Sequence, residues 1–362
     1  MASNRYVCTE CLKPDLTAEE CIWSNPYTKT VGHAPPRRKM FQSYSAEQRE
    51  YKLWRENGWK LHCPEGHLLP PDSHNRDMLV IALWGESGAG KTAFVKALIN
   101  QLELENTLKP LGITGELAPG WRQTYKDEYL NKNEPTHPIL SGQPLRKPLV
   151  LELEVNGRKV NVLLYDTSGE EGKTEEEAQN QYHFAHITDV LLFFAPPATL
   201  DKLPAEARKR GRRATQSKLL TREKIQVAVD VAKGSPRQMR RRQKLVVPIF
   251  VLSKADQLGE TTGFPVDVLK PRKYDRGVRG VISDLNAETD ELVPYIIDKG
   301  GETLLHKVQS FNGKGRCVAV SGTGSDDDDS GTASASIAGA PNRCLDPLII
   351  ALWELGFIEA KP

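Results

Sequence analysis

The chain has 362 residues, of which 39% are hydrophobic and 27% are charged. This apolar content excludes a disordered chain, and the length suits one large domain or two of ordinary size. The formal net charge of +2 hides a basic segment at 201–244, where 15 Lys and Arg residues face 4 Asp and Glu residues. The average charge therefore indicates no class of partner.

Three features narrow the class of protein further. The longest apolar run, Met78 to Trp84, is seven residues long, which is too short to cross a bilayer as a helix. The N-terminus lacks the apolar core of a secretory signal. Six cysteines without regular spacing do not make a disulfide scaffold in a chain of this length. We therefore expect a cytoplasmic protein with no transmembrane segment.

Cysteine and histidine mark the first segment of the chain, 1–72. Cys8 and Cys11 form a C-x-x-C pair, and Cys63 and His67 follow about 50 residues later. Thiolate and imidazole are the ligands that tetrahedral Zn²⁺ takes, and a Pro and a Gly in the second pair favour a tight turn. We expect a zinc-ribbon-like module with a structural zinc ion; free thiols in a small flexible tail are the alternative. Rival fourth ligands are Cys21 and His62.

After this segment, apolar runs alternate with helical patterns. The run at 78–84 predicts a buried strand by its length and β-branched content. Apolar residues at helical spacing predict a helix at 92–104. Residues 106–148 hold many Gly, Pro and polar residues, and we expect a long loop region there.

A hairpin is the next predicted unit. Strands are expected at 149–155 and 159–165, and Asn156-Gly157 between them is a strong short-range turn signal. Strands that alternate with helices, together with one hairpin, predict an α/β fold with a mostly parallel sheet and one antiparallel edge strand. Further helices are expected at 171–186, 219–232, 281–308 and 345–355, and further buried strands at 189–195, 245–252 and 317–320.

The segment Gly85 to Thr92 matches G-x-x-x-x-G-K-[ST], with a predicted strand before it and a predicted helix after it. Its glycines let backbone N–H groups face phosphate oxygens, and the helix start adds a positive dipole end. Lys91 places a charge on the outer phosphates, and the Thr92 hydroxyl is a ligand for Mg²⁺. A glycine-rich turn without a ligand is the alternative. The residues expected to contact a nucleoside triphosphate are Gly85, Glu86, Ser87, Gly88, Ala89, Gly90, Lys91 and Thr92.

A second motif, Asp166 to Gly169, follows the hairpin and reads D-x-x-G. A carboxylate at a strand tip beside the phosphate loop can hold the Mg²⁺ shell, and the Gly169 amide can meet a γ-phosphate. The tetrapeptide also occurs by chance in many turns. Its position directly after an Asn-Gly hairpin favours the functional interpretation.

Two further motifs follow later strands. In the segment Ser253 to Asp256, the Asp256 carboxylate can accept hydrogen bonds from two N–H groups on the Watson–Crick edge of guanine. Adenine has no matching pair of N–H groups on that edge. The stem of Lys254 can lie along the purine face. A polar strand-to-helix turn is the alternative. Ser321 and Gly322, followed by a threonine, can place a backbone N–H on a purine carbonyl or simply form a loop.

In this order the four motifs resemble those of Ras-like (TRAFAC-type) P-loop GTPases, over roughly 76–360. The third motif departs from the family pattern, because Ser253 replaces the usual Asn or Thr. The resemblance implies a doubly wound Ras-like sheet that binds Mg²⁺ and GTP or GDP, together with a protein effector or activating partner. The insertions and the cysteine-bearing N-terminus look more like bacterial zinc-ribbon or double-GTPase-type relatives than a minimal small GTPase.

Two positions would determine how fast such a protein hydrolyses GTP. Many Ras-like proteins carry a Gln after the D-x-x-G motif that orients the attacking water; here the residue is Glu170. A carboxylate accepts from water but adds negative charge near the γ-phosphate, so slow hydrolysis is expected. Thr136 is the best candidate for the switch threonine, with Thr124 or no such residue as alternatives.

The sequence thus predicts a GTP-binding protein that hydrolyses GTP slowly to GDP and phosphate and acts as a nucleotide-dependent switch. Two alternatives stay open. One is a nucleotide-binding scaffold with little or no hydrolysis, in which Glu170 marks a lost catalytic Gln. The other is a P-loop ATPase, in which the resemblance at 253–256 is a coincidence.

The basic insertion, 197–244, carries arginine clusters at 208–213 and 237–244 that could contact nucleic acid or an anionic membrane. The segment 201–244 contains no Phe, Trp or Tyr, so base stacking has little support. We favour a solvated insertion near the rim of the site. A low-complexity tract at 322–340 is expected to be a loop.

Overall fold

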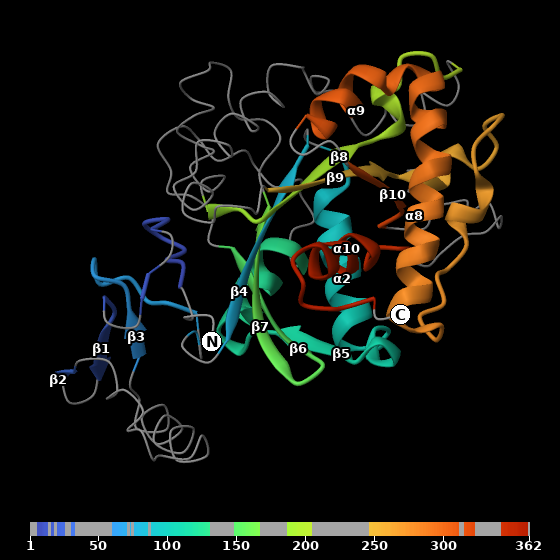
Figure 1. Ribbon diagram of the computed structural model, residues 1–362. Coiled ribbons are helices and arrows are strands. Elements are labelled where there is room, and N and C mark those ends of the chain that lie inside the picture. The colour runs from blue at the N-terminus through green and yellow to red at the C-terminus, as the bar shows by residue number, and fades with distance from the viewer. Residues whose placement is uncertain are drawn as a thin grey trace, which may run out of the picture.

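The structure is a computed structural model that describes residues 6–13, 16–17, 20–25, 30–32, 60–70, 73, 76–85, 88–130, 148–166, 187–204, 246–310, 315–322 and 342–360 (Figure 1). Within these residues the chain forms an α/β fold on a seven-stranded, mostly parallel sheet. A small three-stranded antiparallel sheet lies near the N-terminus.

The strands of the small sheet are β1 (Ile22–Asn25), β2 (Thr30–Gly32) and β3 (Lys60–His62). The strands of the large sheet are β4 (Asp77–Trp84), β5 (Ile113–Leu117), β6 (Leu149–Val155), β7 (Arg158–Asp166), β8 (Val190–Ala195), β9 (Val247–Ser253) and β10 (Arg316–Val320). The α-helices are α2 (Lys91–Glu103), α3 (Arg122–Tyr125), α8 (Gly277–Ile296), α9 (Glu302–Gln309) and α10 (Asp346–Glu354).

The order of the large sheet is β10-β9-β8-β4-β7-β6-β5. Strand β4 pairs in parallel with β7 on one side and β8 on the other, and β9 and β10 continue the parallel set. Strand β6 runs antiparallel to both of its neighbours. The carboxyl ends of the five parallel strands therefore meet at one edge, the position at which open α/β sheets bind ligands.

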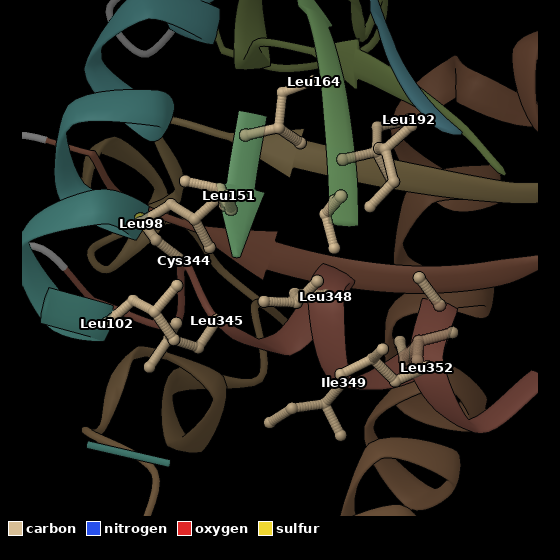
Figure 2. Close-up of a cluster of buried hydrophobic side chains, with 14 of the residues drawn as sticks. Leu98, Leu102, Leu151, Leu164, Leu192, Cys344, Leu345, Leu348, Ile349 and Leu352 are labelled. Carbon is tan, nitrogen blue, oxygen red and sulfur yellow. The ribbon is translucent and has the colours of Figure 1, made fainter. Parts of the chain in front are cut away.

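Both faces of the sheet are buried because side chains alternate along each strand. On β4, Val80 and Trp84 belong to one hydrophobic cluster, whereas Leu79 and Leu83 belong to the other. Helices α2 and α10 cover the second face, and Figure 2 shows their leucines meeting side chains of β6, β7 and β8. Helix α9 and the N-terminal segment contribute to the first.

Most of the predicted elements are confirmed. The strands and hairpin lie within one or two residues of the expected positions, as do the helices after the phosphate loop and near the C-terminus. The predicted helical stretch 281–308 is divided into α8 and α9 by a π-helical turn, Ile297–Gly301, in which Gly300 leaves the helical conformation. The predicted helices at 171–186 and 219–232 lie outside the described residues.

The long loop expected at 106–148 is wrong in its first half. Strand β5 lies there and pairs with β6, so the antiparallel strand β6 is internal and β5 forms the edge. The strand escaped prediction because it is short, contains a glycine and buries only Ile113 and Leu117 fully. Residues 131–147 lie outside the described part of the chain.

The N-terminal segment packs directly on the large sheet. Tyr6, Val7 and Cys8 are buried in the same hydrophobic cluster as Val80 and Trp84 of β4. The Val7 amide donates to Met78 Sδ at 3.1 Å. None of the helices in the described residues has the length and hydropathy that a membrane span requires.

Candidate functional site

The predicted phosphate loop leaves the carboxyl end of β4 and enters α2. Gly90 is the N-cap of α2 and has φ 91°, a left-handed conformation that favours glycine. The first backbone N–H groups of a helix have no partner within the helix, so they are available to an anion. Strand and helix thus follow one another along the chain as the motif predicts; Glu86 and Ser87 lie outside the described residues.

Lys91 is buried at the base of this loop, with 6% of its surface exposed. Its ammonium donates to the Gly85 carbonyl oxygen at 2.6 Å, which closes the loop on itself. Thr92 follows in the first turn of α2 and is half-buried. A cation and a hydroxyl therefore stand at the helix start, where the dipole also favours negative charge.

Asp166 ends β7, the strand next to β4. In the parallel register it pairs with Leu83, two residues before Gly85. The Tyr129 hydroxyl donates to Asp166 Oδ2 at 3.3 Å. Tyr129 is buried, lies in the π-helical turn Lys126–Leu130 and stacks on Tyr125. Sequence reasoning missed this residue because it lies in the region read as a loop.

The predicted base-recognition motif lies directly against the phosphate loop. Ser253 ends β9, and Lys254 follows with φ 52°, a left-handed conformation that is uncommon for a residue with a side chain. A β-carbon at Gly90 would lie 3.9 Å from Lys254 Cγ and from Ser253 Cβ. Burial lowers the pKa of Lys254, and Asp256 opposes that shift. Asp256 itself is half-buried in the 3₁₀ turn Ala255–Leu258.

The segment after β10 completes this edge of the sheet. Gly322 approaches the first turn of α2 so closely that a β-carbon there would lie 2.8 Å from the Ala93 carbonyl carbon. Ser321 is buried and forms an antiparallel bridge with Asn342, with N–O distances of 3.1 and 2.8 Å. The fourth predicted motif therefore contacts the helix that carries the first.

A buried ionic network supports this bridge. Asp346, at the start of α10, is 1% exposed and accepts from Arg272 Nε with both oxygens at 3.0 Å. The Tyr274 hydroxyl donates to it at 3.2 Å, and Arg343 Nη1 lies 3.6 Å from it. Glu288 of α8 accepts from both arginines. The network thus ties α8 and α10 to Asn342, the partner of Ser321.

Besides Glu86 and Ser87, three predicted residues cannot be placed in this site. Thr136, Gly169 and Glu170 all lie outside the described residues. The alternative switch residue, Thr124, lies in α3. The described part of the chain therefore brings together the other residues predicted for phosphate, magnesium and base contacts, and their roles stay predictions.

A second site lies in the N-terminal segment, where Cys8, Cys11, Cys63 and His67 come together. Their ligand atoms all lie within 4.8 Å of one another. Cys11 Sγ is 3.9 Å from Cys63 Sγ, close to the separation of about 3.7 Å that tetrahedral bonds of about 2.3 Å to zinc would give. This cluster could hold a metal ion, and its donor set is compatible with zinc.

The rival ligands are placed differently. Both ring nitrogens of His62 are engaged, Nε2 with Ser24 Oγ at 2.7 Å and Nδ1 with the Gly66 carbonyl at 2.9 Å. Cys21 is buried and does not belong to the four-residue group. The described geometry therefore agrees with the predicted set and gives no support to either rival.

The groups around the Cys₃His cluster would stabilise a bound cation. His67 turns Nδ1 toward Cys63 Sγ at 3.4 Å, while its Nε2 lies 3.9 Å from Glu10 Oε2. A carboxylate behind a ligating imidazole fixes the tautomer of the ring. Burial raises the pKa of the Cys8 thiol to about 12, so a thiolate at this position requires a neighbouring cation.

Fold and site together define an α/β protein with a glycine-rich loop between strand and helix at the carboxyl edge of its sheet and a separate Cys₃His cluster. No protein-family model matches the sequence, and no curated protein matches it. The crystal structure of a bacterial selenocysteine-specific elongation factor is similar over 67% of this chain, with 13% identity and a TM-score of 0.29. The chain spans only 25% of that factor.

The Cys₃His cluster generates the first prediction. Purified protein is expected to contain one zinc ion per chain by atomic absorption, and Cys63→Ser is expected to lose it because a closed tetrahedral site needs all four ligands. Cys317→Ser is the matched control, since Cys317 is an equally buried thiol on β10. Folded wild-type protein without metal would contradict the assignment.

The ionic network generates the second prediction. Asp346→Ala leaves two buried guanidinium groups without their shared carboxylate, and the loss of one partner of a buried ion pair costs about 3–5 kcal/mol. Chemical denaturation should show this loss in the free energy of unfolding. Asp298→Ala removes a solvent-exposed carboxylate that pairs with Lys299 and should change stability by no more than about 1 kcal/mol. Equal stability of the two variants would mean that the network is dispensable.

Proposed function

We propose that this chain is a Ras-like GTP-binding protein that hydrolyses GTP slowly to GDP and phosphate and acts as a nucleotide-dependent switch. One observation carries the proposal: the segment that begins at Ser253 packs on the phosphate loop at Gly90. The two motifs are separated by more than 160 residues in the sequence. Their contact supports a shared ligand, with phosphates at one motif and a base at the other.

Guanine is the base that this arrangement favours. Asp256 lies two residues beyond Lys254 in the 3₁₀ turn Ala255–Leu258 and is only half-buried. A carboxylate accepts two hydrogen bonds side by side, which suits the two N–H groups on the Watson–Crick edge of guanine. The aliphatic stem of Lys254, next to Gly90, can cover the purine face. Gly322 lies against the first turn of α2, and its backbone N–H is the one proposed for the base, because the Ser321 N–H is donated to the Asn342 carbonyl at 3.1 Å.

The phosphate end is assigned to the first two motifs. Lys91 and the loop amides would hold the β- and γ-phosphates, and Thr92 and Asp166 would hold Mg²⁺. Bound Mg²⁺ neutralises charge that develops on the transferred phosphoryl group. The parallel pairing of β4 with β7 supports this assignment, because it brings Asp166 to the strand that leads into the loop. Catalysis at such a site consists of positioning and electrostatics.

Slow GTP turnover and switching are proposed from sequence motifs in residues outside the described part of the chain. Glu170 stands where many Ras-like proteins have a water-orienting Gln. A carboxylate there repels the γ-phosphate, so we expect a low intrinsic rate and an activating partner that raises it. Thr136 and Gly169 are proposed to contact the γ-phosphate, so that a protein effector recognises the GTP-bound state.

Base preference is tested by calorimetry with GTP and ATP in the presence of Mg²⁺. We expect GTP to bind at least a hundredfold more tightly, a difference of about 2.7 kcal/mol. Asp256→Asn should reduce this preference by about ten- to a hundredfold, since hydrogen bonds to a charged group contribute roughly 1.5–3 kcal/mol. Asp290→Asn, an exposed position on α8, is the control.

The outcomes of that measurement separate the alternatives. Equal affinities, or a preference for ATP, would leave a phosphate loop without the guanine assignment and would favour an ATPase. Tight GTP binding without turnover would favour a nucleotide-binding scaffold.

The metal assignment is tested by Thr92→Ala. We expect Mg²⁺-dependent GTP turnover to fall at least tenfold, because loss of a metal-ligand hydroxyl is worth more than about 1.4 kcal/mol in the transition state. Phosphate release at saturating GTP measures this, with Thr107→Ala as a control outside the site. A variant that keeps full turnover would remove Thr92 from the metal shell.

A further inference from the structure

The Cys₃His cluster lies beside the two strands that carry the proposed nucleotide site. The Tyr165 hydroxyl on β7 donates to the carbonyl oxygen of Thr9, at 3.4 Å. The Val7 amide, on the other side of Cys8, donates to Met78 of β4 at 3.1 Å. The turn that offers Cys8 and Cys11 to a metal is thus bonded to the amino-terminal end of β4, at Met78, and to the carboxyl-terminal end of β7, at the residue before Asp166.

These contacts are buried. Thr9, Tyr165 and Met78 are each less than 7% exposed, and the cysteines Cys8 and Cys63 belong to the same hydrophobic cluster as Tyr165. A buried contact transmits displacement well, because close-packed side chains have little room to absorb it. The metal cluster and the end of β7 therefore form one packed unit.

Tyr165 and Asp166 are neighbours on β7, so their side chains point to opposite faces of the sheet. Tyr165 belongs to the cluster on the face that the N-terminal segment covers, while Leu164 belongs to the cluster under α2 and α10. Asp166 shares the face of Leu164 by the same alternation. The N-terminal segment thus supports, from behind, the backbone that presents Asp166.

A bound metal ion would make the N-terminal segment, and so its support of β7, more rigid. Cys11 and Cys63 are 52 residues apart in the sequence, and the strands of the small sheet have only three or four residues each. A sheet of strands this short has few backbone hydrogen bonds of its own, and small structural units often depend on a metal or a cross-link. Metal bound to all four ligands would join the turn at Cys8 to the turn at Cys63 and so fix the surface on which Tyr165 rests.

We propose that the zinc-binding segment is a positioning element of the nucleotide site: through Thr9 and Tyr165 it holds the end of β7 so that Asp166 is placed for the magnesium ion. This inference rests on the proposed function. Tyr165 is a positioning residue, since it acts through Asp166 and touches no substrate. A zinc segment that serves only to recognise a separate partner is the competing explanation.

Tyr165→Phe in the full-length, zinc-loaded chain is the sharpest test, because it removes one hydroxyl and keeps the ring. We expect the affinity for GTP in Mg²⁺ to fall about fivefold, which corresponds to about 1 kcal/mol. GTP affinity measured without Mg²⁺ should be unchanged, as should the zinc content of one ion per chain. Tyr295→Phe is the matched control, a tyrosine of similar burial in the same cluster but on α8.

Zinc removal is the second arm. A chelated and desalted chain is expected to lose at least as much Mg²⁺-dependent affinity for GTP as Tyr165→Phe does, and to regain it when zinc is returned. If the chelated chain unfolds, as circular dichroism would show, the Tyr165→Phe arm alone decides.

The failures are distinguishable. If the zinc-loaded wild type binds no GTP, the proposed function fails and the coupling fails with it. If the wild type binds GTP but Tyr165→Phe and a folded, zinc-free chain bind it equally well, the coupling alone is overturned. A loss in Tyr165→Phe that is equally large without Mg²⁺ would also overturn it, because the effect would then not pass through Asp166.

Discussion

The parallel pairing of β4 with its two neighbours is the constraint on which the rest of the structure depends. A parallel ladder brings the carboxyl ends of its strands to one edge, and here those ends are Trp84, Asp166, Ala195, Ser253 and Val320. Strands β4 and β10 lead directly into a predicted motif, and β7 and β9 each end at the first residue of one. The four motifs are spread over more than 230 positions of the sequence, and the sheet brings them to one edge. None of them is long enough to specify this arrangement by itself.

The same pairing requires a cover on both faces, because a parallel strand alternates between two buried sides. Helices α2 and α10 cover one side of β4 with leucine, isoleucine and phenylalanine side chains. On the other side, the N-terminal residues Tyr6, Val7, Trp23 and Leu61 join α9 and the end of α8 in one cluster. The cysteine-bearing segment is therefore part of the core of the fold as well as a carrier of potential metal ligands.

The sequence predicted those features whose signal is local. The strand at Met78–Trp84 has a continuous apolar run, the hairpin has its Asn-Gly turn, and the four metal-type residues have recognisable spacing. Strand β5 has no such signal, since Ile113 and Leu117 are buried only once the strand pairs with β6 and packs under α2. Long-range contacts escaped for the same reason: Tyr129 and Tyr165 are ordinary aromatic residues until the fold places their hydroxyls near Asp166 and Thr9. The ionic network around Asp346 likewise joins residues from three separated segments.

The position of the Cys₃His cluster also determines how a metal there could act on the rest of the molecule. Four protein ligands close a tetrahedral zinc site, so no coordination position is left for a substrate. Three thiolates and one imidazole leave a zinc complex with net negative charge, which would not by itself attract a nucleotide phosphate. An influence on the proposed nucleotide site must then be mechanical and pass through the packed contacts to Met78 and Tyr165. Because both contacts reach strands that end at that site, a structural metal and a nucleotide-dependent switch can share one core without sharing any ligand.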